Sequence, residues 1–206
     1  MVKYRITREV IDSRRKKMTT TSYARFDAHK RCERLNNSSL FALTSTSLLL
    51  IYIGILNNYL LPTCPFINPE YLEIFSTFAS VVILALSLVV AFASYSLKSE
   101  RFFRSGNEIK TLCDRLEIIH ESETETFLKI QSQYTHIIKN SDNHQSHNYK
   151  KGRLERKVQD GDTLDGNEFG NRDFISYWAP IVSFYLLTTL SFVTFVYITC
   201  KYIANA

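Results

Sequence analysis

The stretch Ile74–Leu97, IFSTFASVVILALSLVVAFASYSL, decides the fold because it contains no charged residue, no glycine and no proline over 24 residues. An α-helix rises about 1.5 Å per residue, so a helix of this length reaches about 36 Å. The hydrocarbon layer of a bilayer is roughly 30 Å thick. The sequence therefore predicts a transmembrane helix over residues 74–97.

Two further apolar runs, at residues 40–61 and 177–202, lie between strongly polar stretches of the chain. The mean hydropathy of −0.11 over 206 residues hides this pattern, because it averages the apolar runs with the charged segments. The third run begins with Tyr177, Trp178 and Pro180, as expected for a span that starts at the headgroup level. We expect an all-α membrane protein with three spans.

The first two spans are joined by a short connector, residues 62–73, which contains three prolines. Prolines forbid a continuous helix, so we expect residues 40–61 and 74–97 to form a helical hairpin. The connector carries only Glu70 and Glu73, whereas residues 1–39 carry eleven Lys or Arg against four acidic residues. The positive-inside rule then places the N-terminus in the cytoplasm, the connector outside and the C-terminus outside.

The N-terminal segment, residues 1–39, does not resemble a secretory signal, because its first apolar run begins only at Leu40. Its basic run Arg14–Lys17 has two readings, contact with anionic lipid or nucleic acid, or a charge that keeps this end in the cytoplasm. We favour the second reading and expect no direct binding of nucleic acid.

Two polar segments carry apolar residues at helical spacing. Ala24, Ala28, Cys32 and Leu35 share one face of the N-terminal helix, with Arg25, Lys30, Arg31 and Arg34 largely elsewhere. Residues 98–139 repeat the pattern around an acidic patch, which indicates two helices or one bent helix. We expect a small cytoplasmic helical bundle built on Ala24, Ala28, Leu35, Ile109, Leu112 and Leu116.

Residues 140–176 contain many polar residues and four glycines, which predicts a mobile linker, with room for a short helix around residues 154–158. His144 and His147 are three residues apart within it. Because no cysteine or carboxylate set accompanies them in a fixed geometry, we expect solvated loop residues and no metal site.

Small residues recur on one side of the span at 74–97, namely Ser76, Ser80, Ser87 and Ala91. Such residues let helices approach closely in lipid, where van der Waals fit and hydroxyl bonds drive association. The stripe fits packing within the hairpin of one molecule and fits self-association of several molecules, and the sequence leaves both open.

The four cysteines divide by predicted compartment. Cys32 and Cys113 fall in the cytoplasm, where thiols stay reduced, and Cys64 and Cys200 both fall at the outer surface. A disulfide between Cys64 and Cys200 can form if the outer surface faces an oxidising compartment, although no spacing motif supports this pairing.

The sequence contains no phosphate-binding glycine loop, HExxH, CxxC or Gly-x-Ser-x-Gly motif. The span at residues 74–97 carries no charged residue that would serve a proton relay or a charged selectivity ring. We therefore expect a protein without enzymatic activity and without a cofactor, and a membrane-bound enzyme or transporter is disfavoured.

Two segments resemble the SLATT family of bacterial two-transmembrane effector proteins: YARFDAHKRCERLNN at residues 23–37 and SERFFRSGNEIKTLCDRLE at residues 99–117. With the hairpin between them, the resemblance covers roughly residues 15 to 140, and the third span is an addition to the two-span plan. It implies an effector of antiviral defence in the bacterial inner membrane. The implied partners are the lipid bilayer, further copies of the chain, and a nucleotide-signal sensor, nucleotidyltransferase or reverse transcriptase encoded nearby.

Two functions follow as hypotheses. The first is an effector that oligomerises on an upstream signal, forms a pore or disrupts the inner membrane, and causes abortive infection. The second is a membrane-anchored sensor or scaffold that recruits a partner through its cytoplasmic helices.

Overall fold

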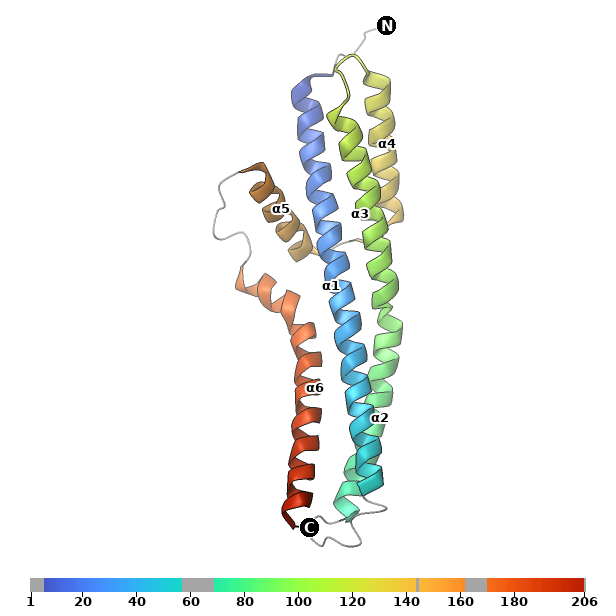
Figure 1. Ribbon diagram of the computed structural model, residues 1–206. Coiled ribbons are helices and arrows are strands. Elements are labelled where there is room, and N and C mark those ends of the chain that lie inside the picture. The colour runs from blue at the N-terminus through green and yellow to red at the C-terminus, as the bar shows by residue number, and fades with distance from the viewer. Residues whose placement is uncertain (1–5, 57–68, 144, 162–169, 206) are drawn as a thin grey trace. The chain divides into compact units, whose positions relative to one another are not determined.

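The computed structural model describes residues 6–56, 69–143, 145–161 and 170–205, and every regular element in these ranges is a helix (Figure 1). The all-α fold is confirmed, and three segments are long and apolar enough to cross a membrane. The chain divides into two compact units. Unit 1 contains Met1–Glu33 and Ser96–Tyr177, and unit 2 contains Arg34–Tyr95 and Trp178–Ala206.

Helix α1, Arg8–Ile55, is one uninterrupted helix of 48 residues. It includes both the basic N-terminal helix and most of the first predicted span, so the expected boundary at residue 39 is not a break in the backbone. The physical reason is local, because no proline or glycine occurs before Gly54. The basic run Arg14–Lys17 is thus separated from Leu40 by more than twenty residues of helix.

Helix α2, Pro69–Ala93, contains most of the second predicted span and is followed by α3, Tyr95–Glu117. The two are separated by Ser94, which has a φ of 49°. This left-handed backbone conformation costs an ordinary L-residue roughly 1 to 2 kcal/mol. The span predicted over residues 74–97 therefore contains one non-helical residue, Ser94, between α2 and α3.

In unit 1, α1 packs with α3 and with α4, Thr124–Asn140 (Figure 1). Their shared hydrophobic core takes its buried side chains from all three helices and from Ile119 in the loop between α3 and α4: Ile11, Met18, Ile109, Leu112, Cys113, Leu116, Ile119, Phe127 and Ile130. The acidic patch noted in the sequence falls around this loop, since α3 ends at Glu117 and α4 begins at Thr124. The pattern in residues 98–139 thus forms two helices.

The segment expected to be a mobile linker contains helix α5, Ser146–Asp160. It ends at Gly161, whose φ of 73° and amide bonds to the last carbonyls form a glycine C-cap. The linker prediction is wrong here because it relied on polar composition, whereas α5 is held by polar contacts to α1 described below. Helix α6, Asn171–Asn205, also begins before the predicted start of the third span at Tyr177.

In unit 2, the membrane half of α1 packs against α6. Most buried residues in this half of α1, together with Leu56 just after it, follow an alternating spacing of four and three: Leu35, Ser39, Ala42, Thr46, Leu49, Ile53 and Leu56. Ser38 is also buried. The buried residues of α6 in this unit, Ile181, Ser191 and Ile198, fit the same repeat. This spacing is typical of helices that pack nearly parallel or antiparallel.

Two hydroxyl pairs and a cluster of apolar side chains hold this α1–α6 seam together. Thr46 Oγ1 lies 3.0 Å from Ser191 Oγ, and the Tyr52 hydroxyl lies 2.9 Å from Thr199 Oγ1. Leu49, Ile53 and Leu56 form the apolar cluster with Ile198. The first span therefore makes buried contacts with the third span, a pairing that the expected hairpin and third span left unspecified.

We expect the Thr46–Ser191 pair to stabilise the seam by about 0.6 kcal/mol, the average for hydrogen bonds between membrane helices. Thr46→Val and Ser191→Ala should each lower the unfolding temperature in detergent, and the double variant should lose less than the sum. Thr44→Val is the matched control, because the exposed Thr44 hydroxyl bonds only to the Leu40 carbonyl of its own helix. Additive losses in the double variant would contradict the pairing.

Candidate functional site: an uncovered span and a buried polar network

None of the four residues on the predicted association face of α2 is buried. Ser76, Ser80, Ser87 and Ala91 fall within about 60° of one another around the helix, at roughly 100° per residue. Ser80 and Ala91 are exposed, and Ser76 and Ser87 are half-buried. No described side chain from Glu70 to Ala93 is buried, whereas a third of the apolar window of α1 is.

The serine hydroxyls on this face are satisfied within α2. Ser76 donates to the Glu73 carbonyl at 2.9 Å, Ser80 to the Ser76 carbonyl at 2.7 Å, and Ser87 to the Leu84 carbonyl at 2.8 Å. In lipid an unpaired polar group is costly, and these bonds remove that cost. The face can therefore meet either lipid or another helix.

The predicted bundle residues are all buried. Ile109, Leu112 and Leu116 belong to the main core of unit 1, and Ala28 packs with Cys32 and Phe102 in a smaller cluster. Ala24 is fully buried where α5 meets α1. Leu35 belongs instead to unit 2, at the start of the α1–α6 seam.

A buried carboxylate, Asp27, organises the contacts of α5 and of the start of α6 with α1. Asp27 is 2% exposed and accepts three hydrogen bonds. Lys151 Nζ donates to Oδ1 at 2.6 Å, Asn148 Nδ2 to Oδ2 at 2.9 Å, and the Tyr177 hydroxyl to Oδ1 at 3.2 Å. Burial lowers the pKa of Lys151, but the bond and charge of Asp27 outweigh it and leave that pKa raised. We call Asp27, Asn148, Lys151 and Tyr177 the Asp27 network.

Gly152 lets α5 approach α1 this closely. A Cβ atom at residue 152 would lie 2.5 Å from the amide nitrogen of Ala24 and 2.9 Å from the carbonyl oxygen of Thr20. Both are backbone atoms that no side-chain rotation relieves, so only glycine fits this position.

Arg31 replaces a backbone hydrogen-bond donor that α6 lacks because of Pro180. Proline has no N–H, so the Ser176 carbonyl four residues before it lacks its usual helical partner. Arg31 Nη2 donates to that carbonyl at 3.2 Å, and Arg31 Nε donates to the Tyr177 carbonyl at 3.4 Å. Arg31 also bonds Gln145 Oε1 at 3.0 Å and lies over the Tyr177 ring at 5.5 Å. It thereby ties the first turns of α6 to α1.

Arg25 was expected away from the apolar face of α1 and is instead 1% exposed. Its Nη1 donates to the Asp142 carbonyl at 2.6 Å and to Ser105 Oγ at 3.3 Å. Its guanidinium lies 5.7 Å from the centre of the Phe102 ring. Burial lowers the pKa of Arg25, and these partners hold its charge inside unit 1. The prediction failed because spacing alone does not show that a long side chain is covered by a following loop.

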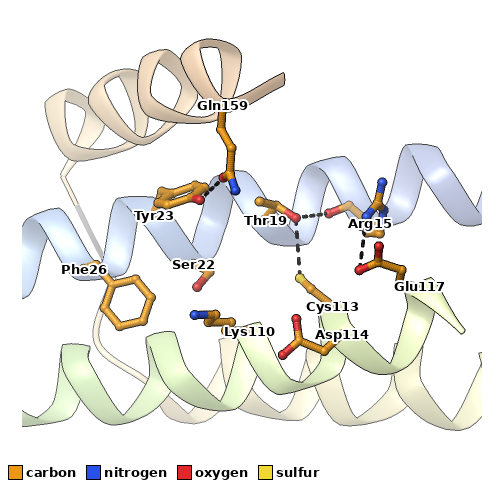
Figure 2. Close-up of a pocket in the computed structure, with 10 residues that line it drawn as sticks. All are labelled: Arg15, Thr19, Ser22, Tyr23, Phe26, Lys110, Cys113, Asp114, Glu117 and Gln159. Atoms are coloured by element: carbon orange, nitrogen blue, oxygen red, sulfur yellow. Dashed lines mark hydrogen bonds and ion pairs between the residues drawn. The ribbon is translucent and has the colours of Figure 1, made fainter. Parts of the chain in front are cut away.

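A cavity of about 200 Å³ lies between α1 and α3 in unit 1, and Figure 2 shows Gln159 reaching it from α5. Across it, Arg15 pairs with Glu117 at 3.5 Å, and Thr19 bonds the Cys113 thiol at 3.7 Å. Burial raises the pKa of Cys113, which keeps the thiol protonated. The cavity is smaller than the roughly 300 to 1,000 Å³ of ordinary ligand pockets.

The remaining predicted sites have mixed outcomes. His147 is 3% exposed, contacts the Tyr177 ring edge-on at 5.5 Å, and has its pKa lowered by burial and by Arg31. His147 is therefore a packed residue and not the solvated one expected, while His144 lies outside the described residues.

Among the described residues no group of three or more His, Cys, Asp or Glu side chains could hold a metal ion. Cys200 is exposed, and the pairing with Cys64 stays a prediction because Cys64 lies outside the described residues.

The Asp27 network and Gly152 were missed in the sequence. The available signal was the position of Asp27, which falls between Ala24 and Ala28 on the small apolar face of α1. A carboxylate on a buried face requires donors, but the sequence does not say which distant residues provide them.

Lys151→Met should destabilise unit 1 by about 3 kcal/mol, because it leaves the Asp27 carboxylate buried without its cation. We take the low end of the range since Lys151 is 35% exposed. Adding Asp27→Asn should recover part of the loss. Chemical denaturation in detergent checks this, with Glu108→Gln as the control because its pair with Arg104 is exposed. Equal losses in the single and double variants would contradict the network.

Arg31→Gln should cost about 1 kcal/mol or more, because the Ser176 carbonyl loses its donor. In a Pro180→Ala background residue 180 regains its N–H, so the same Arg31 substitution should cost less. The measurement is a double-mutant cycle of unfolding free energies. A coupling of zero between residues 31 and 180 would show that Arg31 acts only through its other contacts.

Comparison with known proteins gives one family. The sequence model of the family described as SMODS and SLOG-associating 2TM effector domain family 5 matches residues 7–204. This range includes all three apolar helices, although the description names two transmembrane segments. No curated protein and no solved structure matches the chain at a significant level. A match over nearly the whole chain shows that the protein belongs to this SLATT family of membrane effector domains.

Proposed function

We propose that this protein is the membrane effector of a bacterial antiviral defence system, and that it acts by self-association in the inner membrane. On an upstream signal, copies assemble through α2, form a pore or disrupt the bilayer, and cause abortive infection. The action is non-enzymatic and needs no cofactor. The N-terminus lies in the cytoplasm and the C-terminus outside, as the charge distribution favours.

The observation that carries this proposal is that no residue on the small-residue face of α2 is buried. The first and third spans bury residues against each other in unit 2, whereas no described side chain of α2 is buried. Ser76, Ser80, Ser87 and Ala91 allow close approach of a second helix, and their hydroxyls need no further partner. Family membership supports the effector role.

The signal is proposed to come from a partner encoded nearby, such as a nucleotide sensor, a nucleotidyltransferase or a reverse transcriptase. The family description, which names association with SMODS and SLOG domains, supports a separate partner. The small volume of the cavity in unit 1 supports placing the sensor on another chain.

The double variant Ser80→Leu, Ser87→Leu should abolish depolarisation and dye entry in bacteria that express the chain at graded levels. Two leucines would hold a second helix away from the face. The matched control is Val82→Leu, Val89→Leu, which adds bulk at the same spacing on the opposite, exposed side of α2. Both variants must reach the membrane at equal levels.

The result has three readings. Loss only in the serine variant supports assembly through this face. Equal activity of both variants would show that α2 faces lipid and that assembly uses another surface. An intact membrane potential with the wild type at every level, with its neighbouring genes and infecting phage present, would overturn the effector proposal and favour the anchored scaffold.

A further inference from the structure

We propose that α5 is a latch that holds the first turns of α6 on α1, and that its release switches the protein on. This inference rests on the proposed effector function, because it supplies the regulation of that activity. It concerns residues of unit 1 only, and it reaches the third span through the continuous helix α6.

The first argument is that α5 is attached by few apolar contacts. Its buried residues are His147, Asn148 and Gly152, and none of its side chains belongs to the hydrophobic core of unit 1. Its sequence, SHNYKKGRLERKVQD, is strongly polar. Segments with little buried apolar surface open at lower free energy than the core that supports them. We therefore expect α5 to detach while α1, α3 and α4 stay packed.

The second argument is that α5 holds α6 as well as α1. Lys150 Nζ pairs with Asp173 Oδ2 at 2.6 Å, and Lys151 Nζ lies 3.3 Å from the Tyr177 hydroxyl and 4.8 Å from its ring centre. The His147 ring packs edge-on against Tyr177. When α5 leaves, Tyr177 loses its contacts with Lys151 and His147, and the Asp27 carboxylate to which it donates loses Lys151 and Asn148.

The third argument is the position of Pro180. Residues 171–177 end three residues before the proline, where one backbone bond of α6 is missing. A helix turns most readily at such a point. Release of residues 171–177 is thus transmitted to a place in α6 that is able to change direction.

Three variants test the latch in full-length protein. Gly152→Leu drives a side chain into the backbone of α1, and Lys150→Glu places like charges beside each other. Both should lower the expression level that depolarises cells by about tenfold. Combining Lys150→Glu with Asp173→Lys reverses the pair and should restore the wild-type level. Val158→Leu, an exposed change on the same helix, should have no effect.

Hydrogen exchange of the protein in lipid nanodiscs gives a second measurement that does not depend on pore activity. In Gly152→Leu, exchange should rise about tenfold both in α5 and in residues 171–177, while α3 and α4 stay protected. Protected α3 and α4 also show that the variant is folded. Faster exchange in α5 alone would overturn the link to α6.

The two proposals fail differently. If the wild type depolarises cells at high expression but the Gly152→Leu and Lys150→Glu thresholds are unchanged, the latch is wrong and the effector function stands. If neither wild type nor variants depolarise cells, the effector function fails and release cannot be its switch. The exchange data then decide only whether α5 holds α6.

Discussion

The buried charge of Asp27 is the constraint on which the arrangement of unit 1 depends. A carboxylate that is 2% exposed must be neutralised and hydrogen-bonded, and α1 itself offers no cation at that position. The partners come from α5 and from the start of α6, more than 120 residues later in the chain. Since α5 buries almost no apolar surface, its place beside α1 follows from this charge and from the close fit of Gly152.

The membrane unit is built on a different balance. In lipid, apolar side chains gain little by meeting one another, so the α1–α6 seam depends on regular spacing, close fit and the hydroxyl pairs of Thr46 and Tyr52. The serines of α2 bond to their own helix instead. A helix whose polar groups are already hydrogen-bonded does not require a partner, so the association that we propose for α2 would depend on close fit alone. Such an interface forms and separates at modest cost, which suits assembly on a signal.

The sequence predicts the helices far better than their partners. The span at Ile74–Leu97 follows from length and absence of charge, and the burial of Ile109, Leu112 and Leu116 follows from their spacing. The continuity of α1 was readable too, because no glycine or proline interrupts it before Gly54. The pairing of α1 with α6 and the burial of Arg25 could not be predicted from the sequence, because each depends on contacts between residues that are far apart in the chain. Helix α5 was not predicted, because amino-acid composition does not reveal a single close contact between helices, such as that of Gly152 with the backbone of α1.

The third span is what extends this protein beyond the two transmembrane helices of its family description, and its attachment is uneven along its length. Within unit 2 it is packed through Ile181, Ser191 and Ile198. Within unit 1 its first turns are held by hydrogen bonds and ion pairs, several of them exposed to solvent. Exposed polar contacts are weakened by salt and water, whereas packing in lipid is not. In the orientation and latch that we propose, the N-terminal end of α6 is the end where a soluble partner would act, and Pro180 marks the limit of the segment it would free.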